Sequence, residues 1–408
     1  MKRSYQTRGT IAVQMPYCAM AIKPSQVQAI LQRKRTHFHN FRKSQQSSLD
    51  RYQTAWTSLC QTPTDELHDW LADQHGNLGA RPLTPLNSKT TGICRSGLQW
   101  NNREHSLQWV DRHLSGVTTF AVDGSQIFPS KDLSLPVALV QIGWFENPHS
   151  PDASYTKDIE LDVMTPKDLE LGDSSKPLER MVNKHRFMME TQRLVRYIEQ
   201  VRDAENCLVF FDGALVATFA DAYEDDDRKE YINALVTLLQ ASETHRVPLV
   251  GYVDSSSAHD LTTLLGHHCP KVAGIPKVED TRLLNRYMQW GDRTPMFRCD
   301  RIGILSDYGE HKKRIAFTYL KTNQGLPARL EMPIWMHEAG ICDRVINWVR
   351  AETIVGGGYP YAIETADQTA VLQTHDRQIF FRILQDWANQ EELQLRWSRK
   401  MMSKLRRR

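Results

Sequence analysis

The chain has 408 residues, of which 40% are apolar, 24% charged and 9% aromatic, and its formal net charge is +3. This composition allows a sizeable hydrophobic core and excludes a globally disordered chain. No apolar run approaches the roughly 20 residues of a membrane-spanning helix. The seven cysteines are scattered and include no C-x-x-C pair, which is typical of a reducing compartment. We therefore expect a cytoplasmic protein that does not span a membrane.

Positive charge is concentrated at the two ends of the chain. Residues 1–60 contain ten Lys and Arg against one acid, and residues 396–408 contain seven and no acid. With a total of only +3, the part between these ends must carry −13. Basic ends around an acidic body suit an enzyme that binds a polyanion while an acidic site holds cations. Phe38 and Phe41, set among cations, favour nucleic acid as the polyanion, although a basic C-terminal end can also be a solubilising tail.

The predicted elements have an α/β order. Residues 61–110, rich in Pro, Gly and Asn, show no regular pattern. The expected strands cover residues 117–122, 136–145, 155–164, 207–211, 248–253, 315–320 and 331–335. The expected helices cover residues 25–60, 178–201, 229–242, 260–265, 281–290, 341–354, 360–373 and 376–389. Three successive strands followed by alternating helices and strands predict a ribonuclease H-like mixed α/β sheet flanked by helices, antiparallel at one side and parallel at the other.

Two of the predicted strands end in the same way, at Asp123-Gly124 and at Asp212-Gly213. Ligands of open α/β sheets gather at the carboxyl ends of the strands, and a glycine there allows a ligand to come close. One such aspartate alone is most often a turn residue. Two at matching strand ends repel each other unless cations lie between them, so the pair favours a hard-metal site.

A third carboxylate is expected from the long helix between these two strands. Glu190 lies one helical turn from both Phe187 and Leu194, on an apolar stripe that should face the sheet. Burying a carboxylate is costly unless it is paired or binds a metal. The alternative to a metal ligand is a salt bridge in the core with Arg186 or Arg193.

A fourth carboxylate, Asp367, lies on a helix that opens after Gly356 to Pro360 and shares a stripe with Ile363, Ala370 and Val371. The oxygen ligands of three Asp and one Glu suit Mg²⁺ or Mn²⁺ rather than zinc. Two such ions about 4 Å apart would activate water and stabilise the leaving oxygen in phosphodiester cleavage. The sequence contains no G-x-x-x-x-G-K-[ST] motif, so the chain is not itself a P-loop ATPase.

These residues resemble the NurA nuclease family, a ribonuclease H-like group of prokaryotic enzymes that process DNA ends. The matching pieces stand in family order and span residues 117–385. They are Val122 to Gln126, Glu190, Phe211 to Leu215, Gly291 to Phe297 and Gly358 to Pro360. The resemblance implies a manganese-dependent 5′ to 3′ DNA exonuclease with a two-metal site, with or without single-strand endonuclease activity. It also implies a homodimer and a HerA-type hexameric ATPase that feeds DNA to the enzyme in end resection and repair.

On the family pattern, Asp123, Glu190 and Asp212 would be metal ligands and Tyr359 would lie near the scissile phosphate. Eight residues after this tyrosine the family usually has a histidine, whereas this chain has Asp367, which can still bind Mn²⁺. His375 is a weaker substitute. The departure keeps open a second hypothesis, a catalytically silent nucleic-acid-binding subunit of the same fold.

We accordingly divide the chain into four parts: a basic helical N-terminal arm (1–60), an irregular connecting region (61–110), a NurA-like nuclease domain (111–390) and a basic C-terminal tail (391–408). Within the nuclease domain Asp254, at the end of the strand over 248–253, is a weaker metal-ligand candidate, because a cap of the following serine turn explains it equally well.

Overall fold

The computed structural model describes residues 22–86, 88–170 and 177–398. The first part of the basic N-terminal arm and the end of the basic C-terminal tail lie outside these ranges. Within them, no helix is both long enough and apolar enough to cross a membrane.

The centre of the molecule is a nine-stranded mixed sheet with the order β1-β7-β8-β9-β6-β5-β2-β3-β4. Strands β2, β5 and β6 are parallel, and the pairs on both sides of them are antiparallel. The strands are β1 (Gly79–Pro82), β2 (Thr118–Ile127), β3 (Ala138–Asn147), β4 (Thr156–Met164), β5 (Cys207–Asp212), β6 (Leu249–Val253), β7 (Phe297–Asp300), β8 (Ile315–Leu320) and β9 (Ala328–Pro333). The predicted α/β class is confirmed, but antiparallel pairs flank the parallel centre on both sides rather than on one.

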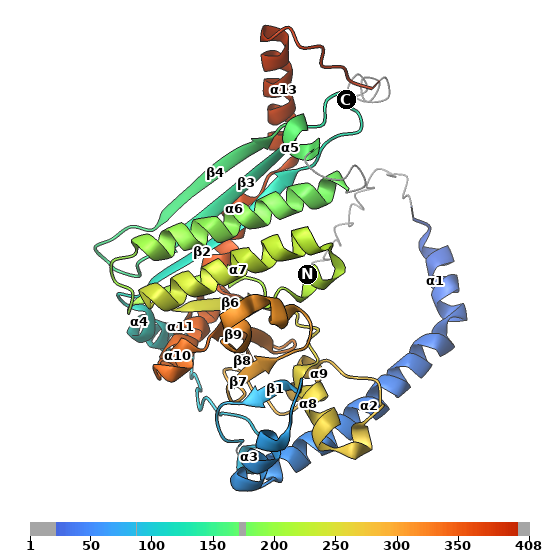
Figure 1. The fold of residues 1–408 in the computed structure, drawn as a ribbon, viewed down its shortest axis with the longest axis vertical. Helices are drawn as coiled ribbons and strands as arrows, with labels where there is room; N and C mark the ends of the chain where they lie inside the picture. The colour runs from blue at the N-terminus through green and yellow to red at the C-terminus, as the bar shows by residue number, and fades with distance from the viewer. Residues whose placement is uncertain (1–21, 87, 171–176, 399–408) are drawn as a thin grey trace, which may run out of the picture.

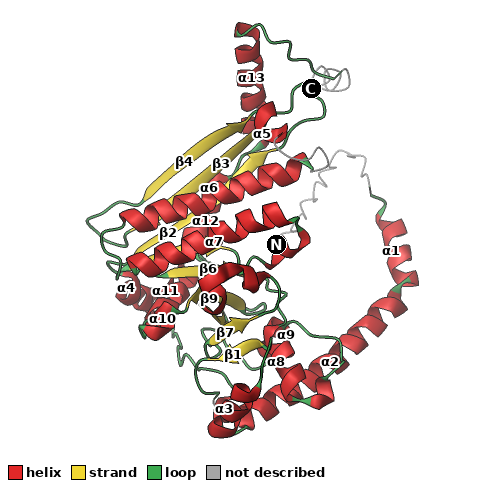
Figure 2. Ribbon diagram, viewed as in Figure 1, coloured by secondary structure: helices red, strands yellow, loops and turns green. Residues whose placement is uncertain are grey.

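Helices cover both faces of the sheet (Figures 1 and 2). Helices α6 and α7 pack on one face, and α4, α11 and α12 form the layer on the other. The α-helices are α1 (Pro24–Arg33), α2 (Arg35–Gln61), α3 (Thr64–Asp73), α4 (Arg103–Leu114), α5 (Pro166–Glu170), α6 (Leu178–Gln200), α7 (Asp225–His245), α8 (Asp260–His268), α9 (Asp280–Asn285), α10 (Trp335–Glu338), α11 (Cys342–Val355), α12 (Tyr361–Ala370) and α13 (Thr374–Gln390). Short 3-10 helices include η2 (Thr218–Ala222) and η4 (Ile304–Lys313).

Alternation along the central strands divides the apolar side chains between two cores. Phe120 and Val122 of β2 belong to the core under α6 and α7, and Ala121 belongs to the core under α11 and α12. On β5, Phe210 faces the second core. Because side chains two residues apart point to the same face of a strand, the residues two positions beyond Ala121 and Phe210 also face the α12 layer.

Strand β2 does not end where the sequence predicts. We expected it to stop at the Asp-Gly pair, but it continues to Ile127, because its second half pairs with β3 over Asp123–Ile127. Its other neighbour, β5, ends at Asp212. The sheet therefore has a step, with β2 and β3 reaching beyond the last residue of β5.

The N-terminal arm is helical as predicted, with a break at Lys34 between α1 and α2. Helix α1 has no buried residue, and the buried residues of α2 begin only at Ser48. Figure 1 shows α1 and the first half of α2 extending away from the rest of the chain. The stretch 61–110 is less irregular than expected: it contains α3, most of α4, and β1, which extends the sheet by pairing with β7.

Candidate active site

Two of the predicted metal ligands lie side by side on neighbouring parallel strands. Val122 of β2 is in register with Phe211 of β5, so the next residues, Asp123 and Asp212, are adjacent. Both side chains point toward the α12 layer, as the alternation requires. Asp254 follows the end of β6, the next parallel strand. Its charge acts on Asp212, which places it close to the pair.

Asp367 reaches the same place from α12. Its carboxylate faces that of Asp123, whose protonated form can donate a hydrogen bond to it, and its charge raises the pKa of Asp212. The apolar positions of its helix, such as Ile363 and Ala370, are buried, but Asp367 itself is exposed. It therefore lies at the border of the apolar stripe, facing the carboxylates. His375 is exposed in the first turn of α13 and makes no hydrogen bond or ion pair with the four carboxylates in the described part of the chain.

Tyr359 is carried into the site by the glycine-rich turn between α11 and α12. Gly358 has φ +118°, a conformation that side-chain-bearing residues rarely adopt. The Tyr359 hydroxyl donates a hydrogen bond of 3.0 Å to Oδ1 of Asp212. Its ring meets that of Tyr252 edge to face at 5.1 Å. Burial and the nearby Asp212 carboxylate raise the pKa of Tyr359, so the phenol remains a donor at neutral pH.

Glu190 comes from the opposite layer, on α6, and is buried as predicted. It forms the salt bridge with Arg186 that the sequence offered as the alternative to a metal ligand. Nη1 of Arg186 lies 2.5 Å from Oε1 of Glu190 and 3.9 Å from Oδ1 of Asp123. The same nitrogen donates to the carbonyl of Gly124 at 3.2 Å. Arg186 thus stands between two of the carboxylates.

Gly124 allows this approach. A Cβ at this position would lie 2.7 Å from Cγ of Arg186 and closer still to Oε1 of Glu190. Any side chain at 124 would therefore push the glutamate away from Asp123. The glycine after Asp123 is explained by close packing of a carboxylate and an arginine against the strand.

Burial and mutual repulsion make ionised carboxylates costly at this site. Burial, the hydrogen bond that protonated Asp123 can donate to Asp367, and the charge of Asp212 together raise the pKa of Asp123 to about 6. Burial raises the pKa of Glu190 to about 8 despite the nearby Arg186. Asp212 is in contact with solvent, yet the protein around it raises its pKa, as it does that of Asp254. Additional cations would stabilise the ionised forms.

The donor set fits Mn²⁺ or Mg²⁺. It consists of carboxylate oxygens, the ligands that these hard cations prefer, and their raised pKa values mean that one arginine does not balance their charge. As the side chains stand, no three His, Cys, Asp or Glu residues of the described chain are arranged to hold a metal ion. In this structure the cation in contact with Glu190 is the guanidinium of Arg186.

Sequence reasoning did not assign Arg186 to the site, although the i, i+4 spacing from Glu190 indicated the ion pair. The other candidate partner, Arg193, lies over the ring of Trp144 at 4.2 Å. The motif from Gly291 to Phe297 has a structural role: Asp292 is buried and accepts hydrogen bonds from Arg95, at 2.6 Å, and from the backbone of Ser96, at 3.0 Å.

A mixed sheet with helices on both faces and carboxylates clustered where its parallel strands end defines an α/β protein of the ribonuclease H-like class with an acidic site. The family model for the NurA domain matches residues 117–372, from the start of β2 to just beyond α12. The chain belongs to the NurA family, whose members are generally nucleases. The matched part contains all five predicted site residues. A comparison with curated proteins found no match.

Proposed function

We propose that this protein is a metal-dependent DNA nuclease that hydrolyses phosphodiester bonds with two Mn²⁺ or Mg²⁺ ions. The observation that carries the proposal is the meeting of Asp123, Glu190, Asp212 and Asp367 from β2, α6, β5 and α12. Elements from both layers contribute carboxylates whose charges act on one another, and a structural role for all four would leave their charge largely unbalanced.

Each residue has a defined part in this proposal. Bound metal ions would supply an activated water and charge stabilisation at the leaving oxygen. Asp123 and Asp212 present their carboxylates from adjacent strands, and Glu190 is held against Gly124 from the other side. The Tyr359 hydroxyl fixes the orientation of Asp212 through its 3.0 Å hydrogen bond. Arg186, next to Glu190, supplies positive charge close to where a phosphate would lie.

The finer parts of the proposal follow the family. We propose 5′ to 3′ digestion of DNA ends in end resection, with a HerA-type ATPase as partner. The exposed first half of the arm supports a DNA or partner surface, because Phe38 and Phe41 are 58% and 64% exposed among basic residues. Deleting residues 1–44 should weaken binding of DNA or of the ATPase, and each lost phosphate contact should lower the salt slope of log K by about one.

We also propose a homodimer. Strand β4 is an edge of the sheet, and Ile159, Leu161 and Val163 on one of its faces are 43%, 52% and 43% exposed. Long exposed apolar edges invite pairing with another chain. Light scattering after size-exclusion chromatography would test the dimer, and Leu161→Lys should dissociate it.

Digestion of end-labelled single- and double-stranded DNA with Mn²⁺, Mg²⁺ or EDTA tests the main proposal. We expect cleavage with Mn²⁺ and none with EDTA. Asp123→Ala and Asp212→Ala should each abolish cleavage while DNA binding survives. A variant that keeps more than about a tenth of the wild-type rate would refute the metal assignment, because losing a metal ligand should cost far more.

The alternative is a catalytically silent DNA-binding subunit. Two observations favour it: Arg186 is the cation in contact with Glu190, and the family histidine is replaced by Asp367. Binding of DNA by the wild type without cleavage under any of the metal conditions would support this alternative.

A further inference from the structure

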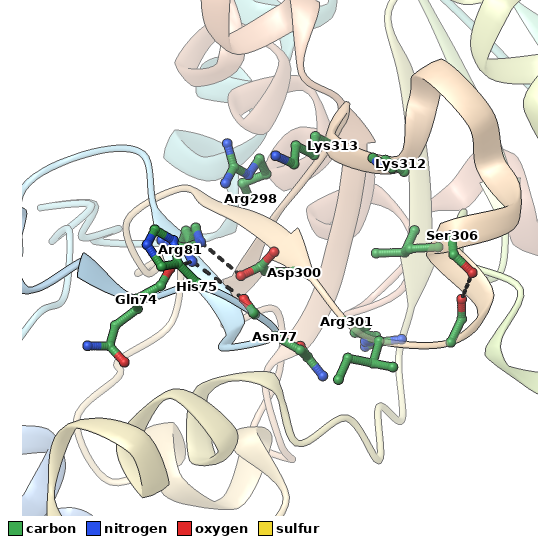
Figure 3. Close-up of a pocket in the computed structure, with 14 residues that line it drawn as sticks. Gln74, His75, Asn77, Arg81, Arg298, Asp300, Arg301, Ser306, Lys312 and Lys313 are labelled. Carbon is green, nitrogen blue, oxygen red and sulfur yellow. Dashed lines mark hydrogen bonds and ion pairs between the residues drawn. The ribbon is translucent and has the colours of Figure 1, made fainter. Parts of the chain in front are cut away.

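A cavity lined by basic residues lies far from the carboxylates, at the other end of the sheet. A cavity of about 790 Å³ opens between the segment leading into β1, the end of β7 and η4 (Figure 3). Strands β8, β9, β6 and β5 separate β7 from β2. Five intervals of about 4.8 Å separate β7 from β2 by about 24 Å across the sheet. The cavity lies farther than this from Asp123, because β7 runs antiparallel to β2 and its end lies toward the amino end of β2. The charged residues that line it are Arg81, Arg298, Asp300, Arg301, Lys312 and Lys313.

Two of the five cations in the cavity have structural partners. Arg81 donates to Asp300 at 2.8 Å and to the carbonyls of Leu71 and Gln74. Arg301 forms a two-pronged contact with Asp260, at 2.6 Å from each carboxylate oxygen. These pairs fix the walls of the cavity.

The other three cations, Arg298, Lys312 and Lys313, have no ion pair with any residue that the structure describes. Nε of Arg298 is also shielded from solvent and has no hydrogen-bond partner within the described chain. A buried donor without an acceptor destabilises the folded protein. Arg298 pairs with Ala316 of β8, three residues after Lys313, so the two cations come from neighbouring segments. Three cations without an acidic partner in the described part of the chain, beside a buried donor without an acceptor, favour the binding of an anion in this cavity.

The lining indicates which anion. It contains no aromatic ring apart from His75, so no platform is present on which a base would stack. Contacts from Arg and Lys bind phosphates of a nucleic-acid backbone without reading its sequence.

We propose that this cavity binds backbone phosphates of the DNA strand remote from the point of cleavage. The choice of DNA as ligand rests on the proposed function. At a rise of about 3.4 Å per nucleotide, 24 Å corresponds to about seven nucleotides, which is the shortest strand that could join the two places. A longer strand held at the carboxylates could also contact the cavity, which would bind the substrate at a second place.

The test measures DNA binding without cleavage. A fluorescent 20-nucleotide single strand is titrated with the full chain in EDTA at several salt concentrations. The double variant Arg298→Gln/Lys313→Gln should bind about tenfold more weakly at low salt, and its salt slope of log K should be shallower by about 1.4, or 0.7 for each lost phosphate contact. The single variant Lys313→Gln, at an exposed position that cannot affect folding much, should show half of that change in slope.

The matched control is Arg202→Gln/Lys271→Gln, which removes the same charges from exposed positions outside the cavity. It should leave the slope unchanged. Equal slopes for the wild type, the cavity variants and the control would overturn the proposal. Inorganic phosphate is the second probe: if it raises the melting temperature of the wild type but not of the cavity variants, while DNA binding is the same in all, the cavity binds a free anion and the proposal is also overturned. Because the measurement needs no cleavage, an inactive wild type would refute the proposed function and leave this result standing.

Discussion

The substitution Glu190→Gln isolates the electrostatic cost of the acidic site. Glutamine has nearly the shape of glutamate, and its carbonyl oxygen can still accept the hydrogen bond that Arg186 now donates at 2.5 Å. What the variant loses is the ionisable proton. Any difference in stability that changes with pH therefore reports the carboxylate itself.

The sign follows from the direction of the pKa change. Burial raises the pKa of Glu190 from its ordinary value of 4.5 to about 8 in the folded protein. The folded state thus favours the protonated form, and this stabilisation is fully present below pH 4.5 and lost as the pH rises toward 8. Each pH unit in that window costs up to about 1.4 kcal/mol, so the metal-free wild type should lose about 3 kcal/mol by pH 7.

The assay is urea unfolding in EDTA between pH 5 and pH 8.5. The difference in unfolding free energy between Glu190→Gln and the wild type should be small at pH 5 and should grow to a few kcal/mol in favour of the variant by pH 8. Saturating Mn²⁺ should make the wild type the more stable of the two proteins, since only the wild type has the Glu190 carboxylate to bind the metal. Glu199→Gln, at an exposed position of the same helix, is the control and should behave like the wild type. A difference that stays constant from pH 5 to pH 8.5 would show that Glu190 is not held in a costly ionised state.

Three further predictions concern the same site. Gly124→Ala places a Cβ against Glu190 and Arg186, so thermal unfolding should show a loss of about 1–3 kcal/mol and nuclease assays a larger proportional loss of rate; an active and equally stable variant would contradict the close packing. Tyr359→Phe removes the donor to Asp212 and should lower the cleavage rate about 10- to 100-fold without changing the melting temperature, whereas an unchanged rate would reduce the tyrosine to packing. Asp367→His should give a working nuclease that needs more Mn²⁺ and Asp367→Ala a severely impaired one, measured as rate against Mn²⁺ concentration; if Asp367→Ala matches the wild type throughout, the site closes without this residue.

The sequence predicted the central elements well because their patterns are strong. Apolar β-branched runs located β2, β3 and β5, and the spacing around Glu190 placed it on the buried face of α6. Strands β1 and β7 were missed because each has only four residues, and the pairing of β1 with β7 joins segments more than 200 positions apart. Local pattern cannot supply a partner at that distance.

The details of the site depended on tertiary contacts in the same way. The step after Asp123 arises because β3 continues to pair with β2 where β5 has ended, which no feature of the Asp-Gly pair indicates. The spacing allowed either Arg186 or Arg193 as the partner of Glu190. Only the packing of Arg193 over Trp144 decides between them. The border position of Asp367 likewise follows from how α12 meets β2 and β3.

The step in the sheet makes the position of Asp123 independent of the length of the β2–β3 ribbon beyond it. Asp123 is fixed by the parallel pairing with β5, whereas the β2–β3 ribbon beyond it, up to Ile127 and Ala138, pairs only with itself and with β4. Lengthening or shortening that ribbon by paired residues would raise or lower one wall beside the carboxylates without moving them. Insertions at the hairpin can therefore change the height of this wall while Asp123 keeps its pairing with β5.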